Sequence, residues 1–158
     1  MQVDPRGQRF AAGITTLVLA SVLVTANAWL LAVQTLVFAA AVLLGLRFSP
    51  YGLLYTRLVR PRLGPPRELE DAAPPRFAQG VGLAFGLIGL LGYLFVGDWL
   101  GIGATAVALF AAFLNAAFGF CLGCETYLLI RRLTDFTHRA AHPDRPDGDH
   151  HAPAQQRQ

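Results

Sequence analysis

The sequence predicts an all-α integral membrane protein, a bundle of four transmembrane helices with a short interfacial helix in its central cytoplasmic loop. The chain has 158 residues and is 54% hydrophobic, with long apolar runs that ordinary soluble domains lack. All thirteen basic residues are arginines, and they lie between or beyond the apolar runs, as the flanking charges of membrane helices do. They form no basic stripe, so membrane lipid is the expected partner and nucleic acid is not.

Four apolar runs define a predicted membrane domain over residues 10–133. The expected spans are about 10–28, 29–46, 77–96 and 100–130. A cytoplasmic arm (1–9) precedes the domain, and a proline-rich, charged cytoplasmic tail (134–158), expected to be disordered, follows it. The first run also imitates a signal peptide, but it exceeds the usual signal-peptide core and a second apolar run follows at once.

The fourth run is longer than a membrane-crossing helix needs to be. A straight helix over residues 100–130 would measure about 46 Å, whereas the hydrocarbon core is about 30 Å thick. The run must therefore tilt, break or continue as an interfacial helix. Gly119 and Gly123 are the expected weak points, because glycine allows backbone angles that other residues avoid.

Small and polar residues mark the predicted helix contacts. Gly82 and Gly86 lie four residues apart in the third run, where they allow another helix to approach closely. A stripe of small residues along the fourth run includes Asn115 and Gly119 and is expected to face the other helices. We expect Asn115 to bond across the bundle to Gln34 or to a threonine.

The central loop, residues 47–76, is rich in arginine and proline, and its first part is the predicted interfacial helix. Arg57, Arg60 and Arg62 are expected to contact lipid headgroups, with docking of a soluble protein as the less favoured interpretation. The arm, the loop and the residues after the fourth run carry every arginine, and the two short turns between spans carry none. Under the positive-inside rule both termini and the loop face the cytoplasm of a bacterial cell.

Both cysteines lie at the end of the fourth run, in the stretch Cys121-Leu-Gly-Cys124-Glu125. Residues three apart share a helix face, so the two thiols can oxidise together or pass a disulfide onward. A break at Gly119 would place Cys121 at the start of a new helix and lower the pKa of its thiol. Glu125 is a candidate proton relay. Two cysteines packed only as small apolar residues are the structural alternative.

Metal binding is the least favoured interpretation of the pair, because two thiolates do not complete a tetrahedral site and further ligands would have to come from a second subunit or the tail. The four histidines all lie beyond residue 137 and are expected to be solvated. No cofactor signature is evident, and nothing in the residues supports a quinone.

Several segments together resemble a family of bacterial membrane proteins described as a domain of unknown function, DUF4395. They are Val3-Asp-Pro-Arg-Gly7, the loop from Ser49 to Pro66, Pro75-Arg-Phe-Ala-Gln79, and Asn115 through Cys124. The resemblance covers about residues 2–133. The family has no established activity. The resemblance implies an association with thioredoxin-like and rhodanese-like sulfurtransferase proteins, and this association implies a thiol or sulfur-handling role. A looser similarity to quinone-linked, disulfide-forming four-helix proteins is weakened here by the predicted cytoplasmic position of the dithiol and the lack of a second cysteine pair.

Two functions follow as hypotheses. The first is thiol–disulfide or sulfur-transfer chemistry through a cytoplasm-facing dithiol, with Cys121 attacking, Cys124 resolving, and a thioredoxin-like or rhodanese-like partner. The second is a non-catalytic membrane anchor or small permease component whose cysteines only pack. Whether the protein is an enzyme stays open at this point.

Overall fold

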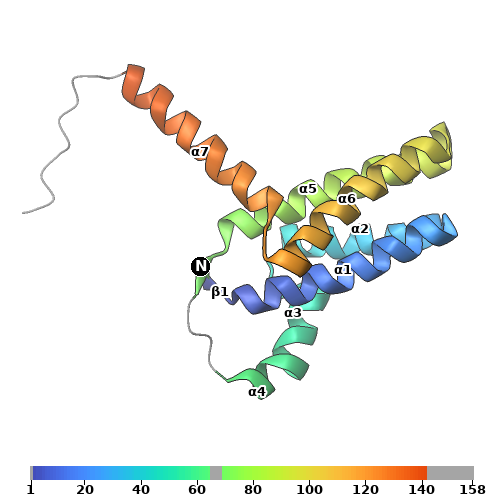
Figure 1. Cartoon of the computed structure of the whole chain (residues 1–158), viewed down its shortest axis with the longest axis horizontal. Coiled ribbons are helices and arrows are strands. Elements are labelled where there is room, and N and C mark those ends of the chain that lie inside the picture. Colours follow the sequence, from blue (N-terminus) through green and yellow to red (C-terminus); the bar gives the residue numbers. More distant parts are fainter. Residues whose placement is uncertain (1, 65–68, 142–158) are drawn as a thin grey trace, which may run out of the picture.

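The computed structural model describes residues 2–64 and 69–141, the last seven of them by backbone only. Four helices run side by side and form an elongated bundle (Figure 1): α1 (Pro5–Thr25), α2 (Ala28–Leu43), α5 (Ala73–Leu91) and α6 (Asp98–Phe118). One π-helical turn, η2 (Gly92–Val96), continues α5. Helix α1 packs mainly on α6, and α2 packs mainly on α5.

The beginnings of α1 and α2 are set by side chains that accept otherwise unpaired helix N–H groups. Asp4 accepts the N–H of Arg6 at 2.9 Å, and Pro5 occupies the first helical position. Asn27 accepts the N–H groups of Trp29 and Leu30 at 2.9 and 3.2 Å. The tight turn between the two helices is completed by Ala26 in the left-handed region, with φ of +48°.

Three helical segments are long and apolar enough to cross a membrane: Pro5–Thr25, Ala73–Val96 and Asp98–Phe118. Helix α2 is also apolar but has 16 residues, about 24 Å of helix. This is shorter than the roughly 20 residues of a typical span. The structure therefore supports an all-helical membrane protein with three candidate spans and a fourth, shorter apolar helix.

The core of the bundle is small, and its outer surface is apolar. Leu19, Val22, Leu31 and Ala108 form the buried cluster. Large apolar side chains on the long helices point outward instead, including Val24 (87% exposed), Phe95 (79%) and Phe110 (60%). Water would disfavour such a surface, whereas lipid would not.

The segment between α2 and α5 is largely helical. It comprises α3 (Pro50–Leu54), the π-helical turn η1 (Tyr55–Val59) and α4 (Arg60–Leu63). Pro61 does not end this helix, because it lies in the first turn of α4, where proline is tolerated. The helix ends instead at Gly64, with φ of +70°.

Two contacts fasten this segment and the start of α5 to the N-terminus. Strand β1 (Gln2–Val3) pairs antiparallel with β2 (Glu70–Asp71), with Gln2 opposite Asp71. The Tyr55 hydroxyl donates to the Asp4 carboxylate at 2.8 Å. The polar arm is therefore part of the folded structure.

Several expected boundaries shift. Helix α1 begins within the expected arm 1–9, because Asp4 caps it there. Helix α2 ends at Leu43, before the expected residue 46, and Gly45 follows with φ of +96°. Helix α5 begins at Ala73 and thus takes up the end of the expected loop 47–76.

The largest difference concerns the expected span 100–130. It is divided between α6 and α7 (Leu122–Ala141), and α7 leaves the bundle at an angle (Figure 1). Helix α7 also runs into the expected tail 134–158, of which residues 142–158 lie outside the described part of the chain.

One end of the bundle carries all the arginines whose side chains are described. They belong to the start of α1, the connection from α2 to α5, the start of α5, and α7, which meet at the same end (Figure 1). The opposite end holds the two short turns, around Ala26 and Gly97. The dithiol lies at the arginine-bearing end, where α6 gives way to α7.

Candidate functional site

The last apolar run breaks at Gly119. This residue has φ of +71°, and its N–H donates to the carbonyl of Asn115 at 3.0 Å. The left-handed conformation ends α6 in the usual manner of a glycine C-cap. Three residues, from Gly119 to Cys121, then connect α6 to α7.

Arg9 of α1 completes the end of α6. Its Nη2 donates to the carbonyls of Ala116 and Ala117, each at 3.4 Å. These carbonyls lack partners within their own helix, and a cation there also offsets the negative end of the helix dipole. Sequence reasoning missed this role, because Arg9 is 107 residues from its first acceptor.

The break leaves Cys121 immediately before the first turn of α7. Its Sγ accepts the backbone N–H of Cys124 at 3.4 Å, and its carbonyl accepts the N–H of Glu125 at 3.0 Å. Cys121 thus caps α7 as serine or asparagine commonly caps other helices. A sulfur in this position benefits from the positive end of the helix dipole, which favours the thiolate.

The two cysteines differ in acidity because they share one hydrogen bond. The side chain of Cys124 donates to the sulfur of Cys121, and this bond is the largest cause that lowers the pKa of Cys121 to about 7. Backbone N–H groups of Cys124 and Gly123 add to the effect, while burial and the charge of Glu125 oppose it. The same side-chain bond raises the pKa of Cys124, and burial raises it further. Cys121 is therefore the more acidic thiol of the pair, and Cys124 is the one that keeps its proton.

The two thiols and the neighbouring carboxylate differ in their exposure to solvent. Cys121 and Cys124 are both free and half-buried, whereas Glu125 is exposed. The dithiol is therefore partly shielded from solvent, and Glu125 can exchange protons with water.

Helix α5 holds the start of α7 in place. A Cβ atom on Gly123 would lie 2.6 Å from the Cβ of Ala78, so the two helices touch at a point that only glycine permits. One turn further on, the rings of Phe77 and Tyr127 lie 5.6 Å apart. These contacts fix the direction of α7 and with it the position of Cys121.

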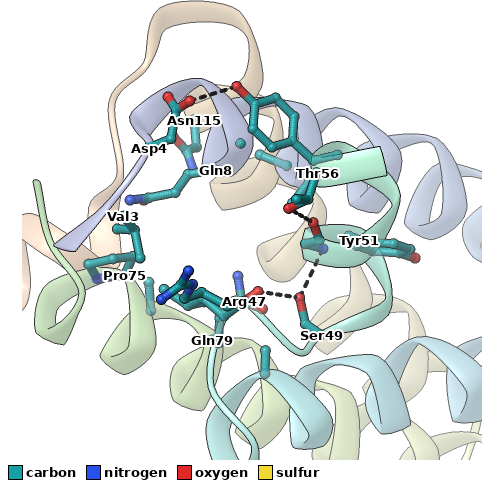
Figure 2. A pocket seen from close by; sticks show the side chains of 18 of the residues that line it. Val3, Asp4, Gln8, Arg47, Ser49, Tyr51, Thr56, Pro75, Gln79 and Asn115 are labelled. Carbon is teal, nitrogen blue, oxygen red and sulfur yellow. Dashed lines mark hydrogen bonds between the residues drawn. The ribbon is translucent and has the colours of Figure 1, made fainter. Parts of the chain in front are cut away.

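Cys121 lies on the wall of a cavity of about 270 Å³. The cavity is formed where the start of α1, the loop after α2, the α3–α4 segment, the start of α5 and the end of α6 come together. Figure 2 shows polar side chains from these elements around a central hollow, among them Gln8, Arg47, Gln79 and Asn115. Of these, only Asn115 was expected to have a special role.

The other expected polar contact forms differently. Gln34 is fully buried, but its Oε1 accepts the hydroxyl of Tyr51 at 2.6 Å and does not pair with Asn115. The Tyr51 side chain points away from the cavity (Figure 2) and reaches Gln34. Asn115 lines the cavity instead. The reason is the α3–α4 segment, which brings Tyr51 against α2, a contact that periodicity along the spans does not reveal.

The remaining expected residues lie apart from the dithiol. Gly82 and Gly86 face α2, where added Cβ atoms would lie 3.0 Å from the Phe38 ring and 2.6 Å from Thr35 Oγ1. The three loop arginines lie on η1 and α4, and all are exposed; they are Arg57, Arg60 and Arg62. Only Arg60 of these three also lines the cavity.

Among the described residues, no group of three or more histidine, cysteine, aspartate or glutamate side chains is placed to hold a metal ion. The histidine side chains of the C-terminal region fall outside what the structure describes.

Comparisons with curated proteins and with solved structures found no match. A comparison with family models did find one, over residues 3–132, which spans the bundle, the α3–α4 segment, the dithiol and the first half of α7. The chain therefore belongs to the family described as domain of unknown function (DUF4395).

Proposed function

We propose that the protein carries out thiol–disulfide exchange or sulfur transfer through Cys121, with Cys124 as the resolving thiol. The observation that carries the proposal is the position of Cys121. Its sulfur caps α7 and accepts the Cys124 N–H at 3.4 Å, and the residue lies on the wall of a cavity. Cysteines that serve only as packing have no need of an activated sulfur beside an accessible space.

In the exchange reaction the Cys121 thiolate attacks one sulfur of a partner disulfide. A Cys121–partner mixed disulfide forms, and the partner's other sulfur leaves as a thiolate. Cys124 then loses its proton and attacks the Cys121 sulfur, which releases the partner's second thiol and leaves a Cys121–Cys124 disulfide. Two electrons pass from the pair to the partner, and the reverse sequence returns them. Glu125 is exposed next to Cys124 and is proposed to relay its proton to water.

The sulfur-transfer reaction uses the same two residues. The Cys121 thiolate attacks the outer sulfur of a partner persulfide, the partner cysteine leaves as a thiolate, and Cys121 becomes a persulfide. Attack by Cys124 on the inner sulfur then forms the internal disulfide and releases hydrosulfide. The proposed protein partners are thioredoxin-like for the first reaction and rhodanese-like for the second.

The proposed setting is a bacterial cytoplasmic membrane with both termini in the cytoplasm. The gathering of the described arginines at one end of the bundle supports this orientation. An even number of crossings is then required, so α2 is proposed to cross as a fourth, short span, with locally thinned lipid. The exposed Arg57, Arg60 and Arg62 would then meet lipid headgroups or the partner protein. A membrane-impermeant maleimide should label Cys121 in inverted vesicles and not in intact cells; the opposite result would reverse the orientation.

The function is tested with two protein substrates. The first is a thioredoxin-like protein whose single active-site cysteine forms a mixed disulfide with a coloured aromatic thiol. The second is a rhodanese-like protein whose active-site cysteine carries a persulfide. The Cys124→Ala variant should displace the coloured thiol and stay attached to the first protein. The Cys121→Ala variant should do neither. The wild-type chain should release hydrosulfide from the second protein if transfer is its reaction.

Exchange with both proteins no faster than that of a short peptide thiol would overturn the proposal. The anchor or permease interpretation would then be preferred. Under that interpretation the double change Cys121→Ala and Cys124→Ala would leave both stability and cellular phenotype intact.

A further inference from the structure

The cavity beside Cys121 contains polar groups without partners. The Nε2 of Gln8 is shielded from solvent and has no acceptor within the described part of the chain. The amides of Gln79 and Asn115 share the same cavity wall (Figure 2). Buried donors are normally satisfied, so the Gln8 amide is a donor at this wall that an acceptor atom would satisfy.

The charges at the cavity favour an anion. Arg47 and Arg60 both line it, and neither forms an ion pair among the described residues. The one carboxylate on the wall, Asp4, is already engaged by the Tyr55 hydroxyl at 2.8 Å and by the Arg6 N–H at 2.9 Å. Two free guanidinium groups and an unpaired amide suit carboxylate oxygens, which accept several charged hydrogen bonds at once.

The size of the cavity limits the ligand to a small molecule. About 270 Å³ is close to the lower end of the volumes of small-molecule sites, enough for a short aliphatic chain with polar ends. Cys121 lies on the same wall, which favours a ligand with a bond that a thiolate can break.

We propose that this cavity binds a low-molecular-weight disulfide that carries carboxylate groups and presents it to Cys121. The inference rests on the proposed function and names a second substrate for the same dithiol. Cys121 attacks the small disulfide, one half leaves as a thiolate, and Cys124 then displaces the second half. The small disulfide is thus reduced to two thiols, the pair becomes a disulfide, and a thioredoxin-like partner in its dithiol form returns two electrons to it.

The test uses the reduced full-length chain in nanodiscs of phosphatidylcholine, whose zwitterionic surface neither attracts nor repels the probes strongly. Three disulfides of similar length are compared: dithiodipropionate with two carboxylates, hydroxyethyl disulfide without charge, and cystamine with two amines. Formation of the Cys121–Cys124 disulfide is followed by mass spectrometry after acid quenching. Each rate is divided by that of a short peptide thiol with the same probe, which removes differences in intrinsic reactivity.

Dithiodipropionate should react at least about tenfold faster than cystamine on this normalised scale, the smallest effect expected from one charged hydrogen bond. Arg47→Gln combined with Arg60→Gln should abolish the preference, while oxidation by hydroxyethyl disulfide still exceeds that of the peptide thiol and shows that the dithiol is intact. Arg132→Gln is the matched control, because Arg132 is exposed on α7 and does not line the cavity; it should retain the preference.

The two possible failures differ. Equal normalised rates for the three probes, all well above the peptide thiol, would overturn the ligand inference and leave the exchange reaction standing. Rates with every probe no greater than that of the peptide thiol would overturn the exchange reaction itself. A preference for dithiodipropionate that survives the double arginine change would also refute the role given to this cavity.

Discussion

The acidity of Cys121 depends on its neighbour, and removing that neighbour should show it. The side-chain hydrogen bond from Cys124 is the largest cause of a pKa lowered to about 7. Cys124→Ala deletes this donor but keeps the backbone N–H that lies 3.4 Å from the sulfur. We therefore expect the pKa of Cys121 to rise toward the ordinary thiol value of 9.0.

The magnitude follows from two opposing effects. At pH 7 a thiol with a pKa of 7 is half ionised, and one with a pKa of 9 is about 1% ionised, so a complete return would lower the thiolate fraction about fiftyfold. Each thiolate would become roughly six to ten times more nucleophilic as its basicity rises. The net loss of reactivity at pH 7 is therefore at most about fivefold to eightfold.

The assay is the rate of iodoacetamide alkylation of Cys121 as a function of pH, with the protein in nanodiscs. In the wild-type chain the rate should fall as pH drops below about 7, because the sulfur takes up a proton there. In Cys124→Ala the midpoint should move to higher pH. The Cys121→Ala variant is the control: it removes the hydrogen bond that raises the pKa of Cys124 most, but burial still raises that pKa, so alkylation at pH 7 should be slow. An unchanged midpoint in Cys124→Ala would refute the shared hydrogen bond as the cause.

Two further predictions concern glycines that set the site. Gly119→Ala should lower the free energy of unfolding by about 1 kcal/mol, because Gly119 has φ of +71°. Gly13→Ala is the control; it lies in an open part of α1 and should raise the free energy of unfolding by about 0.5–1 kcal/mol. Thermal unfolding in detergent compares the two variants, and equal changes would contradict the expectation. Gly123→Ala should displace α7, because its Cβ would overlap Ala78, and a protease should then cut the chain between α6 and α7 faster. In the Gly103→Ala control the added Cβ meets no neighbour, so the protease should cut this variant as fast as the wild type. Equal cleavage rates in both variants would show that the contact does not hold α7.

The sequence predicted the helical membrane class well, because that class depends on composition and local patterning. Long apolar runs demand backbone hydrogen bonds within each segment, and the helix satisfies them. The caps at Asp4 and Asn27 are also local features, as is the break at Gly119, where excess length and a glycine indicated a weak point. Local sequence could not decide whether the fourth apolar run tilts, breaks or continues, because this outcome depends on what the segment after the break can pack against.

The candidate site was predictable in part. Two cysteines three residues apart identified the dithiol, and the consequence of a break for Cys121 followed from helix geometry. The cavity was not predictable, because Gln8, Arg47 and Gln79 lie far apart in the chain and none has an unusual sequence environment. The same holds for Arg9 and for the pairing of Gln34 with Tyr51, whose partners are supplied by other elements.

The sequence by itself determined which segments are apolar helices and that the chemistry-bearing thiols lie at the end of the last apolar run, because these properties are set by neighbours within a few residues. Only the tertiary structure decided that α7 leaves the bundle at Gly119, that Gly123 rests on Ala78, and that Cys121 opens into a polar cavity. These features are set by helix packing, in which residues distant along the chain meet at a few ångströms, and no pattern of period 3.6 contains that information.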